Sequence, residues 1–367
     1  NFASKAGMSE ALFKFAGACL GHRKGGVAMA AVGACAGFGA ICGSSLATAA
    51  TMGKVALPEL RRLGYSGALS TGALAAGGTL GILIPPSVIL IIYSILTEQN
   101  IAKMFLCAFI PGLLAALGYI VAISLYVRLN QNSGPIKDRV PWKDRMYLFK
   151  NIWHIILIFV VMIGGIYMGF FTPTEGAAIG AAGTGIIAIT NKSFNIKSFI
   201  EVIESTAVTT GMIFFVLLGA EFFNSFIALT QLPNLLTEFS KENNLEPLIV
   251  VACIMILYLF LGCLMDSLAM ILLTIPVFFP LVMSLDFGLS PEETAIWFGI
   301  LTLVVVEVGL ITPPVGLNVF IINKMAKDVP IIDTFKGVIP FLLSDIIRII
   351  LLFSFPSITL IMLWAFY

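Results

Sequence analysis

Long apolar runs recur along the chain, separated by short polar or charged segments. They occupy residues 105–127, 151–171, 205–229, 247–265 and 338–366. A helix of about 20 apolar residues is long enough to cross the hydrocarbon core of a bilayer. The pattern therefore predicts an all-α polytopic membrane protein that crosses the lipid bilayer several times.

The composition agrees with this class. The chain is 59% hydrophobic and 11% charged, whereas soluble domains carry about 25% charged residues. A net charge of +1 and the lack of a basic helix give no sign of a nucleic-acid partner. The six cysteines lie in or beside apolar runs without metal-ligand spacing, so we expect small buried apolar side chains.

Two segments interrupt the apolar pattern in the manner of re-entrant hairpins. The first, 26–58, contains the uncharged stretch GFGAICGSSLATAATMG and is flanked by the basic segments GHRKGG and ELRRLG. The second, 247–283, is flanked by the acidic segments ENNLE and DFGLSPEE. Because Lys and Arg gather on the cytoplasmic side, we expect the first hairpin to enter from the cytoplasm, with its tip near 43–45. The second hairpin should enter from outside.

An internal repeat relates the two halves of the chain. LGILIPPSVIL at 80–90 matches VGLITPPVGLN at 308–318, with the double prolines 228 residues apart. Three predicted crossings separate the two halves, and an odd number inverts the second half relative to the first. Paired interrupted helices in an inverted repeat are typical of a secondary transporter with its site near the bilayer midplane. This pattern predicts hairpin, broken helix and long helix in each half.

The match extends upstream of the prolines. Thr48 lies ten residues before Pro58, and Asp266 lies ten residues before Pro276. This spacing predicts that Thr48 and Asp266 occupy equivalent positions in the two hairpins.

Charge placement orders the remaining segments. Loop 128–150 carries six Lys and Arg against two Asp and should be cytoplasmic, while 98–103, 231–246 and 284–293 should lie outside. The segment 231–246 is expected to be an amphipathic helix on the outer surface. The predicted organisation is a cytoplasmic-side arm helix (1–25), a first repeat (26–127: hairpin 26–58, broken helix 65–97, helix 105–127), a basic cytoplasmic loop (128–150), connecting or scaffold helices (151–246) and a second repeat (247–366: hairpin 247–283, broken helix 294–323, helix 338–366).

The proline breaks predict the functional chemistry. Proline lacks an amide donor, so carbonyls of the preceding turn are freed, and at membrane depth such backbone survives only within protein or beside a polar site. Freed carbonyls with hydroxyl groups suit a hard monovalent cation such as Na+, and helix N-termini favour an anionic substrate. We expect Na+ as the coupling ion, with no organic cofactor and no catalytic residue. The first predicted sodium site comprises Gly43, Ser44, Ser45, Thr48, Gly81, Ile84 and Pro86, and the second comprises Asp266, Ser267, Gly309, Thr312 and Pro314.

Simpler roles remain open for several of these residues. The prolines could simply kink packed helices without binding an ion. Ser44 and Ser45 could simply cap the second helix of their hairpin. An acid at the bilayer centre costs about 2.5–3.5 kcal/mol on insertion scales, which favours a role for Asp266 near the second site over a cap at the tip. Asp345 and Arg348 are spaced for a local ion pair.

Other acids lie in or beside apolar segments. Glu175 follows the sequence TPT, where capping of a helix is the simplest role. Glu221 and Glu307 lie in apolar runs, where they could face a partner subunit or a cavity, and the sequence does not place them.

Four motifs resemble a known family over nearly the whole chain. GSSLATAATMGKVALPELRRLGY, GGTLGILIPPSVILIIYSILTEQNIAKMFLCAFIPG, GFFTPTEGAAIG and GLITPPVGLNVF closely resemble the large membrane subunit of tripartite ATP-independent periplasmic (TRAP) transporters, the DctM-like or M subunit. The resemblance implies a bacterial inner-membrane importer, driven by sodium, that takes an organic anion from a periplasmic substrate-binding protein. It also implies a small membrane subunit of four helices, a fold of the ion-transporter superfamily, and an elevator movement of the two hairpins.

The resemblance adds three expectations about this chain. It implies that helices precede Asn1, and that Glu175 contacts the binding protein or the scaffold at the outer face. Many family members have Asp where this chain has Thr48, so a contact of that acid is expected to be absent or made differently. Dicarboxylates, sialic acids, keto acids and compatible solutes all fit as the anion.

The sequence also bears on three other functions. GSSLA could hold a serine nucleophile of an intramembrane protease, but the histidines, His22 and His154, lie in a basic loop and at a membrane entrance. A passive channel fits poorly with two hairpins that close from opposite sides. The closest alternative is a stand-alone sodium–carboxylate symporter of the same inverted-hairpin design, which would need no binding protein.

Overall fold

The computed structural model describes residues 1–130, 133–190 and 194–366, and within them every regular element is a helix. The predicted all-α fold is thus confirmed. Residues 131–132 of the predicted basic loop and 191–193 of the connecting region lie outside the described residues. The helices of the described residues are α1 (Phe2–Lys5), α2 (Met8–Leu20), α3 (Gly26–Cys42), α4 (Ser45–Arg62), α5 (Gly67–Leu83), α6 (Val88–Leu96), α7 (Ile101–Leu129), α8 (Trp142–Lys150), α9 (Trp153–Tyr167), α10 (Pro173–Thr190), α11 (Ile196–Leu229), α12 (Leu232–Glu242), α13 (Pro247–Gly262), α14 (Ser267–Met283), α15 (Pro291–Gly309), α16 (Leu317–Met325), α17 (Ile331–Ser354) and α18 (Pro356–Phe366).

Several of these helices can cross a membrane. Among the described residues, α7, α11 and α17 are long and apolar enough by themselves, and two bent pairs, α5 with α6 and α8 with α9, raise the number to five if each pair is one span. The bends are 42° and 53°. Helices α3, α13 and α14 are apolar but shorter, as expected for limbs of re-entrant hairpins.

The first repeat begins with α3 and α4, which reverse direction at Gly43. Gly43 has a φ of +66°, which only glycine adopts without strain. Helix α4 continues to Arg62, four residues beyond the predicted hairpin, with Pro58 inside it. The broken helix follows as α5 and α6, interrupted at residues 84–87 by a cis Pro85–Pro86 bond.

The second repeat has the same order of elements. Helices α13 and α14 reverse at residues 263–266, and α15 and α16 are interrupted at 310–316, where the Pro313–Pro314 bond is also cis. The predicted single helix 338–366 is wrong. It is two helices, because Pro356 lacks a donor and forces the preceding residue out of helical geometry, so α17 ends at Ser354.

The two repeats interlock beyond their breaks. Helix α6 of the first repeat packs on α14 of the second hairpin, and α16 of the second repeat packs on α4 of the first hairpin. The Tyr93 hydroxyl of α6 donates to the Ala295 carbonyl of α15 at 2.7 Å, and its ring meets Phe279 of α14 edge-on. Each half-helix thus fastens to the opposite half of the molecule.

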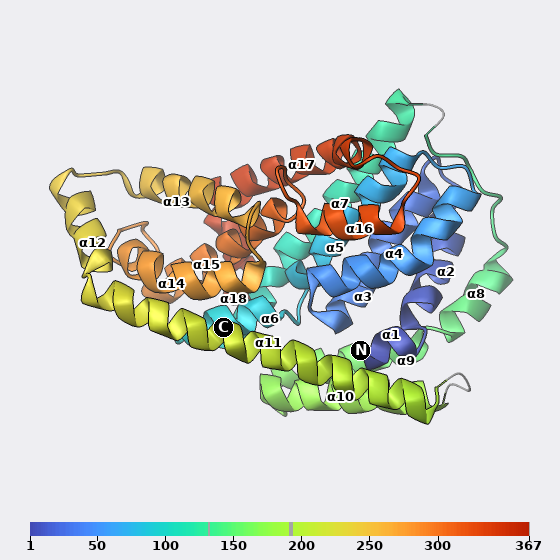
Figure 1. The fold of residues 1–367 in the computed structure, drawn as a ribbon, viewed down its shortest axis with the longest axis horizontal. Coiled ribbons are helices and arrows are strands. Elements are labelled where there is room, and N and C mark those ends of the chain that lie inside the picture. The colour runs from blue at the N-terminus through green and yellow to red at the C-terminus, as the bar shows by residue number, and fades with distance from the viewer. Residues whose placement is uncertain (131–132, 191–193, 367) are drawn as a thin grey trace.

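Segments of like predicted sidedness meet at the two ends of the molecule. At one end the Tyr65 hydroxyl donates to the Pro135 carbonyl, and Arg61 pairs with Asp328, which joins the segments predicted to be cytoplasmic. At the other end Lys103 pairs with Glu292 at 2.7 Å, which joins two segments predicted to lie outside. In Figure 1, α4 and α8 lie toward the right end and α12 and α13 toward the left end.

Helices α9–α12 form the connecting region along one side of the molecule. In Figure 1, α11 runs along the lower edge of the molecule, and α10 is drawn below part of it in this view. Helix α11 begins nine residues before the predicted run and is almost wholly exposed, and its buried residues are Val202, Ala220 and Ile227. Lys5 of the N-terminal arm pairs with Glu201 of α11 at 2.7 Å. This region is therefore attached to the rest mainly by the arm and by α14.

Candidate functional site

The tip of the first hairpin lies against the first helix break. Ser44 is the N-cap of α4, where its side chain accepts from the Ala47 amide at 3.4 Å. A Cβ atom at Gly43 would lie 3.0 Å from the Pro86 carbonyl oxygen. Glycine is therefore needed here both for the turn and for close approach to a backbone oxygen.

Gly81 is the point at which the first hairpin crosses the broken helix. A Cβ atom at Gly81 would overlap the Thr48 hydroxyl oxygen and would lie 2.8 Å from the Ser44 carbonyl oxygen. On the other side, a Cβ atom at Gly39 would overlap the Gly81 Cα. Helices α3, α4 and α5 therefore touch through backbone at this point.

The structure thus brings most of the first predicted sodium site together. Gly43, Ser44, Thr48, Gly81 and Pro86 form one cluster of backbone and hydroxyl oxygens. Ile84 lies at the break itself, with extended backbone. Sodium binding by these residues stays a prediction. Capping was left open as a simpler role for Ser44, and its hydrogen bond with the Ala47 amide shows that it does cap α4.

The second hairpin makes a matching crossing. A Cβ atom at Gly309 would lie 2.6 Å from the Gly262 Cα, so α13 and α15 also touch through backbone. Gly262 lies four residues before Asp266, the N-cap of α14, and Gly39 lies five residues before Ser44, the N-cap of α4. Gly262 was not predicted from the sequence, where its signal is a glycine inside an apolar helix.

The polar groups of the second predicted site have assigned partners. Asp266 is the N-cap of α14 and accepts from the Leu268 amide at 3.1 Å. The Thr312 hydroxyl donates to the Val308 carbonyl at 2.6 Å, within the last turn of α15. Pro314 is exposed. Each oxygen retains lone pairs that a cation could use, so the second site also stays a prediction.

The caps change the alignment of the two hairpins. Ser44 and Asp266 are both N-caps, and Ser45 and Ser267 are the first helical residues after them. The spacing to Pro58 and Pro276 had paired Thr48 with Asp266, and this pairing is wrong. The reason is that Pro58 lies near the end of α4, whereas Pro276 lies in the middle of α14.

Glu307 is the functional-site candidate that the sequence did not place. It is 0% exposed in α15, which is buried from Thr294 to Gly309, and accepts from the Ser267 hydroxyl at 3.0 Å. The Ser45 hydroxyl of the first hairpin also faces this carboxylate. The available signal was an acid two residues before Gly309 in an apolar run, which in a membrane protein marks a functional position by default.

A second buried polar cluster joins the repeats. Arg348 and Asp345 of α17 form the expected ion pair at 2.8 Å, and both are buried. The Tyr119 hydroxyl of α7 donates to Asp345 at 2.8 Å and lies 3.0 Å from the Thr79 hydroxyl of α5. This cluster connects three helices, and the positive charge of Arg348 compensates the charge of the buried carboxylate.

The remaining acids have local roles or lie on the surface. Glu175 closes a capping interaction at the start of α10, where its carboxylate accepts from the Thr172 amide at 2.8 Å and from the Thr172 hydroxyl at 2.9 Å. Contact with a partner protein stays a prediction. Glu221 is exposed on α11.

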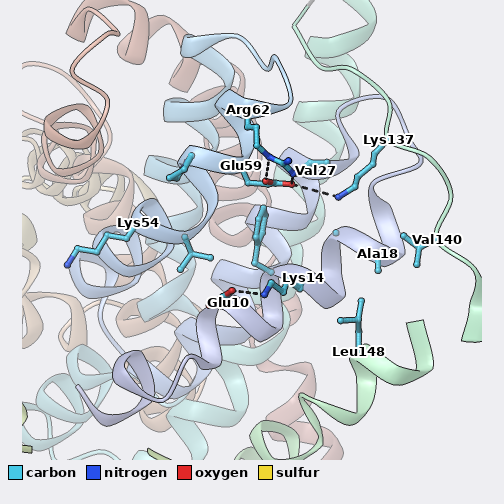
Figure 2. Close-up of a pocket in the computed structure, with 14 residues that line it drawn as sticks. Glu10, Lys14, Ala18, Val27, Lys54, Glu59, Arg62, Lys137, Val140 and Leu148 are labelled. Atoms are coloured by element: carbon cyan, nitrogen blue, oxygen red, sulfur yellow. Dashed lines mark hydrogen bonds and ion pairs between the residues drawn. The ribbon is translucent and has the colours of Figure 1, made fainter. Parts of the chain in front are cut away.

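A pocket of about 680 Å³ opens at the basic end of the molecule, between α2, α4 and the segment 137–148. Figure 2 shows that Glu59 lies between Arg62 and Lys137, with Lys54 pointing away from them. Hydrogen bonding to Arg62, and then its charge and that of Lys137, lower the pKa of Glu59. The pocket is therefore lined by charges that are largely paired.

Paired hairpins, interrupted helices and backbone crossings in two related halves define the class of the protein, a multi-pass helical membrane transport protein. The chain belongs to the DctM component family of tripartite ATP-independent periplasmic transporters, whose family model matches residues 1–358.

Relatives with assigned roles agree with this family. The chain is 34% identical to the C4-dicarboxylate TRAP transporter large permease protein DctM of Pseudomonas aeruginosa, over 98% of this chain and 82% of that protein. It is 33% identical to the sialic acid TRAP transporter permease protein SiaT of Haemophilus influenzae, over 96% of this chain and 56% of that protein. The fold is similar to that of the Alcanivorax borkumensis YdaH transporter, with a TM-score of 0.61 and 14% identity over 97% of this chain and 84% of that chain.

Proposed function

We propose that the chain is the transport subunit of a sodium-coupled importer of an organic anion in the bacterial inner membrane. A periplasmic substrate-binding protein delivers the anion, and a small membrane subunit completes the complex. Relatives are named for C4-dicarboxylates, sialic acids and isethionate. The first two are carboxylates and the third is a sulfonate, so the proposed substrate class is an organic anion, with a carboxylate as the main candidate.

The observation that carries this proposal is the pair of backbone crossings. At Gly39–Gly81 and at Gly262–Gly309 a hairpin meets an interrupted helix so closely that no side chain fits between them. Backbone and hydroxyl oxygens therefore converge at two related points, which is the arrangement that dehydrated Na+ requires. The N-termini of α4 and α14 lie beside them and favour negative charge on a substrate.

The packing supports a movement of the two hairpins together. Each hairpin is locked to its own broken helix by a glycine crossing and to the opposite repeat through α6 or α16. Helix α11 buries only three side chains. We propose that the two repeats move as one body past α9–α11, which with the small subunit form the fixed part of an elevator.

Uptake into liposomes tests this proposal. The complex is reconstituted with candidate binding proteins, a labelled carboxylate and a set Na+ gradient, without ATP. Each Na+ that enters down 100 mV supplies about 2.3 kcal/mol, so uptake should rise with the inward gradient. Undiminished uptake with K+ in place of Na+, and with no ion gradient, would reject the coupling.

Omitting single components separates this function from a stand-alone symporter. Uptake should disappear without the binding protein and without the small subunit. Uptake by the chain alone, at the rate of the full complex, would instead support the stand-alone sodium–carboxylate symporter.

A further inference from the structure

One carboxylate lies between the tips of the two hairpins. Glu307 accepts from the hydroxyl of Ser267, the first residue of α14, and faces the hydroxyl of Ser45, the first residue of α4. These two serines occupy equivalent positions in the two hairpins. The carboxylate is 0% exposed, and the serines are 1% and 2% exposed.

Several oxygen atoms at this position have no hydrogen-bond partner in the protein. Within the described residues Glu307 has no ion-pair partner at 4.0 Å or less, and its Oε2 atom has no hydrogen-bond donor. The hydroxyl oxygens of Ser45 and Thr48 are likewise buried without a hydrogen-bond partner. A buried carboxylate without a compensating charge is strongly unfavourable, so this position requires a neutralising ligand.

The number of oxygens at this position favours a metal cation over a proton. A proton would satisfy the free Oε2 atom of Glu307 and at most the Ser45 hydroxyl that faces it. A hard monovalent cation takes several oxygen ligands at once, including neutral hydroxyls.

We propose that Glu307, with the hydroxyls of Ser45 and Ser267, forms a third cation position between the two predicted sodium sites. Its ligand is a monovalent cation of the size and hardness of Na+. The position shares Ser45 with the first predicted site and Ser267 with the second, so a cation bound there ties the two hairpin tips together. The proposal rests on the proposed sodium coupling and assigns a residue that neither predicted site contains.

The test compares Glu307→Gln with the wild-type complex. Glutamine keeps the shape and can still accept from Ser267, but it removes the charge. The matched control is Glu221→Gln on the exposed face of α11. Two readouts are measured, the rise in thermal midpoint of the purified complex on titration with NaCl against choline chloride, and the Na+ concentration for half-maximal uptake.

We expect the Glu307→Gln complex to remain monodisperse, with half-saturating Na+ raised about tenfold or more in both readouts. The steepness of the uptake curve should fall, whereas Glu221→Gln should match the wild type. Wild-type Na+ curves in a folded Glu307→Gln complex would overturn the proposal. A variant that keeps its Na+ curves but loses the pH dependence of uptake would show that Glu307 carries a proton, which also overturns it.

Two further measurements decide the question if the first test cannot. If Glu307→Gln does not fold, Ser45→Ala and Ser267→Ala are measured singly and together. A shared cation predicts that the double variant shifts half-saturating Na+ by less than the product of the single shifts, and independent sites predict the full product. If wild-type uptake needs no Na+, the proposed function fails, but the thermal titration still reports whether a cation binds at Glu307.

Discussion

Helices α3 and α13 begin the two hairpins, and they differ sharply in their surroundings. Twelve of 17 residues are buried in α3 but only six of 16 in α13, so the first limb of the first hairpin lies in the core and the first limb of the second hairpin lies at the periphery. The breaks differ likewise, because Pro85 is buried whereas Pro313 and Pro314 are exposed. Both hairpins nevertheless meet their broken helices through paired glycines.

The chemistry of the two repeats differs in a related way. The first crossing is lined by backbone and by neutral hydroxyls such as Thr48. The second repeat contributes all the buried or half-buried acids near the tips and in the helix core, namely Asp266, Glu307 and Asp345. The repeat therefore preserves backbone geometry, while the acidic charge is concentrated in its second half.

Removing the buried ion pair of the second repeat should have the largest effect on stability. Asp345→Ala leaves Arg348 and the Tyr119 hydroxyl without the carboxylate that they contact. Breaking a buried pair from one side costs about 3–5 kcal/mol. We expect a large fall in thermal midpoint or loss of monodisperse complex. The double variant Asp345→Leu with Arg348→Met should recover much of this loss, and a stable Asp345→Ala complex would contradict the assigned role.

Substitutions at the glycine crossings should have the second-largest effect on stability. Gly81→Ala and Gly309→Ala each force a methyl group into backbone of the neighbouring hairpin. Overpacking of this kind costs about 1–3 kcal/mol. The thermal midpoint of both variants should fall by similar amounts if the crossings are equivalent. Gly33→Ala on α3 is the matched control, because a Cβ there meets nothing within 4 Å. A variant at Gly309 that matches this control would show that the crossing in the second repeat yields where the crossing in the first does not.

The fold could be predicted from the sequence where pattern and charge coincided. The apolar runs and the flanking charges of 26–58 and 247–283 predicted helices and two hairpins, which correspond to α3–α4 and α13–α14. The ends of the helices were less predictable. Pro356 divides a run that is apolar on both sides, whereas Pro58 lies within a helix. Proline breaks a helix only where no neighbouring structure compensates, and the sequence alone does not show this.

The candidate site was predictable only in part. Glycine and hydroxyl residues at the first tip were placed by motif, and the structure brings Gly43, Thr48 and Gly81 together. Glu307 was not placed, because its partner Ser267 lies 40 residues away on another helix. Such pairings depend on how α14 crosses α15, which local spacing does not encode.

Substitutions at the caps separate capping from sodium binding in both hairpins. Glycine caps a helix within a few tenths of a kcal/mol of serine, whereas alanine costs about 1 kcal/mol. Ser44→Ala and Ser44→Gly should therefore differ in thermal stability. If the Ser44 hydroxyl is a sodium ligand, both variants should raise the Na+ concentration for half-maximal uptake by the same factor. Wild-type Na+ curves in both would limit Ser44 to its cap.

The second hairpin offers a matched test with Asp266→Asn. Asparagine caps as well as aspartate, so the thermal midpoint in the absence of Na+ should stay near that of the wild type. Half-saturating Na+ should rise if the carboxylate is a ligand. Thr312→Ala, which removes the hydroxyl bonded to the Val308 carbonyl, should shift the curve in the same direction. Unchanged curves in both variants would remove the second predicted site.

The smallest effect is expected at the two ion pairs that join the repeats at opposite ends of the molecule. Lys103 pairs with Glu292 at 2.7 Å, and Arg61 pairs with Asp328. Exposed pairs such as the first contribute about 1 kcal/mol or less and weaken with salt, so Lys103→Ala should lower the thermal midpoint slightly, and less at high salt.

The hydrogen bond from Arg61 lowers the pKa of Asp328. A carboxylate with a lowered pKa adds stability above its ordinary pKa and loses it as the pH falls through the lowered value. Thermal midpoints measured from neutral pH downward should therefore converge for wild type and Asp328→Asn below that point. A constant difference across this range would show that the pair does not hold the two repeats together.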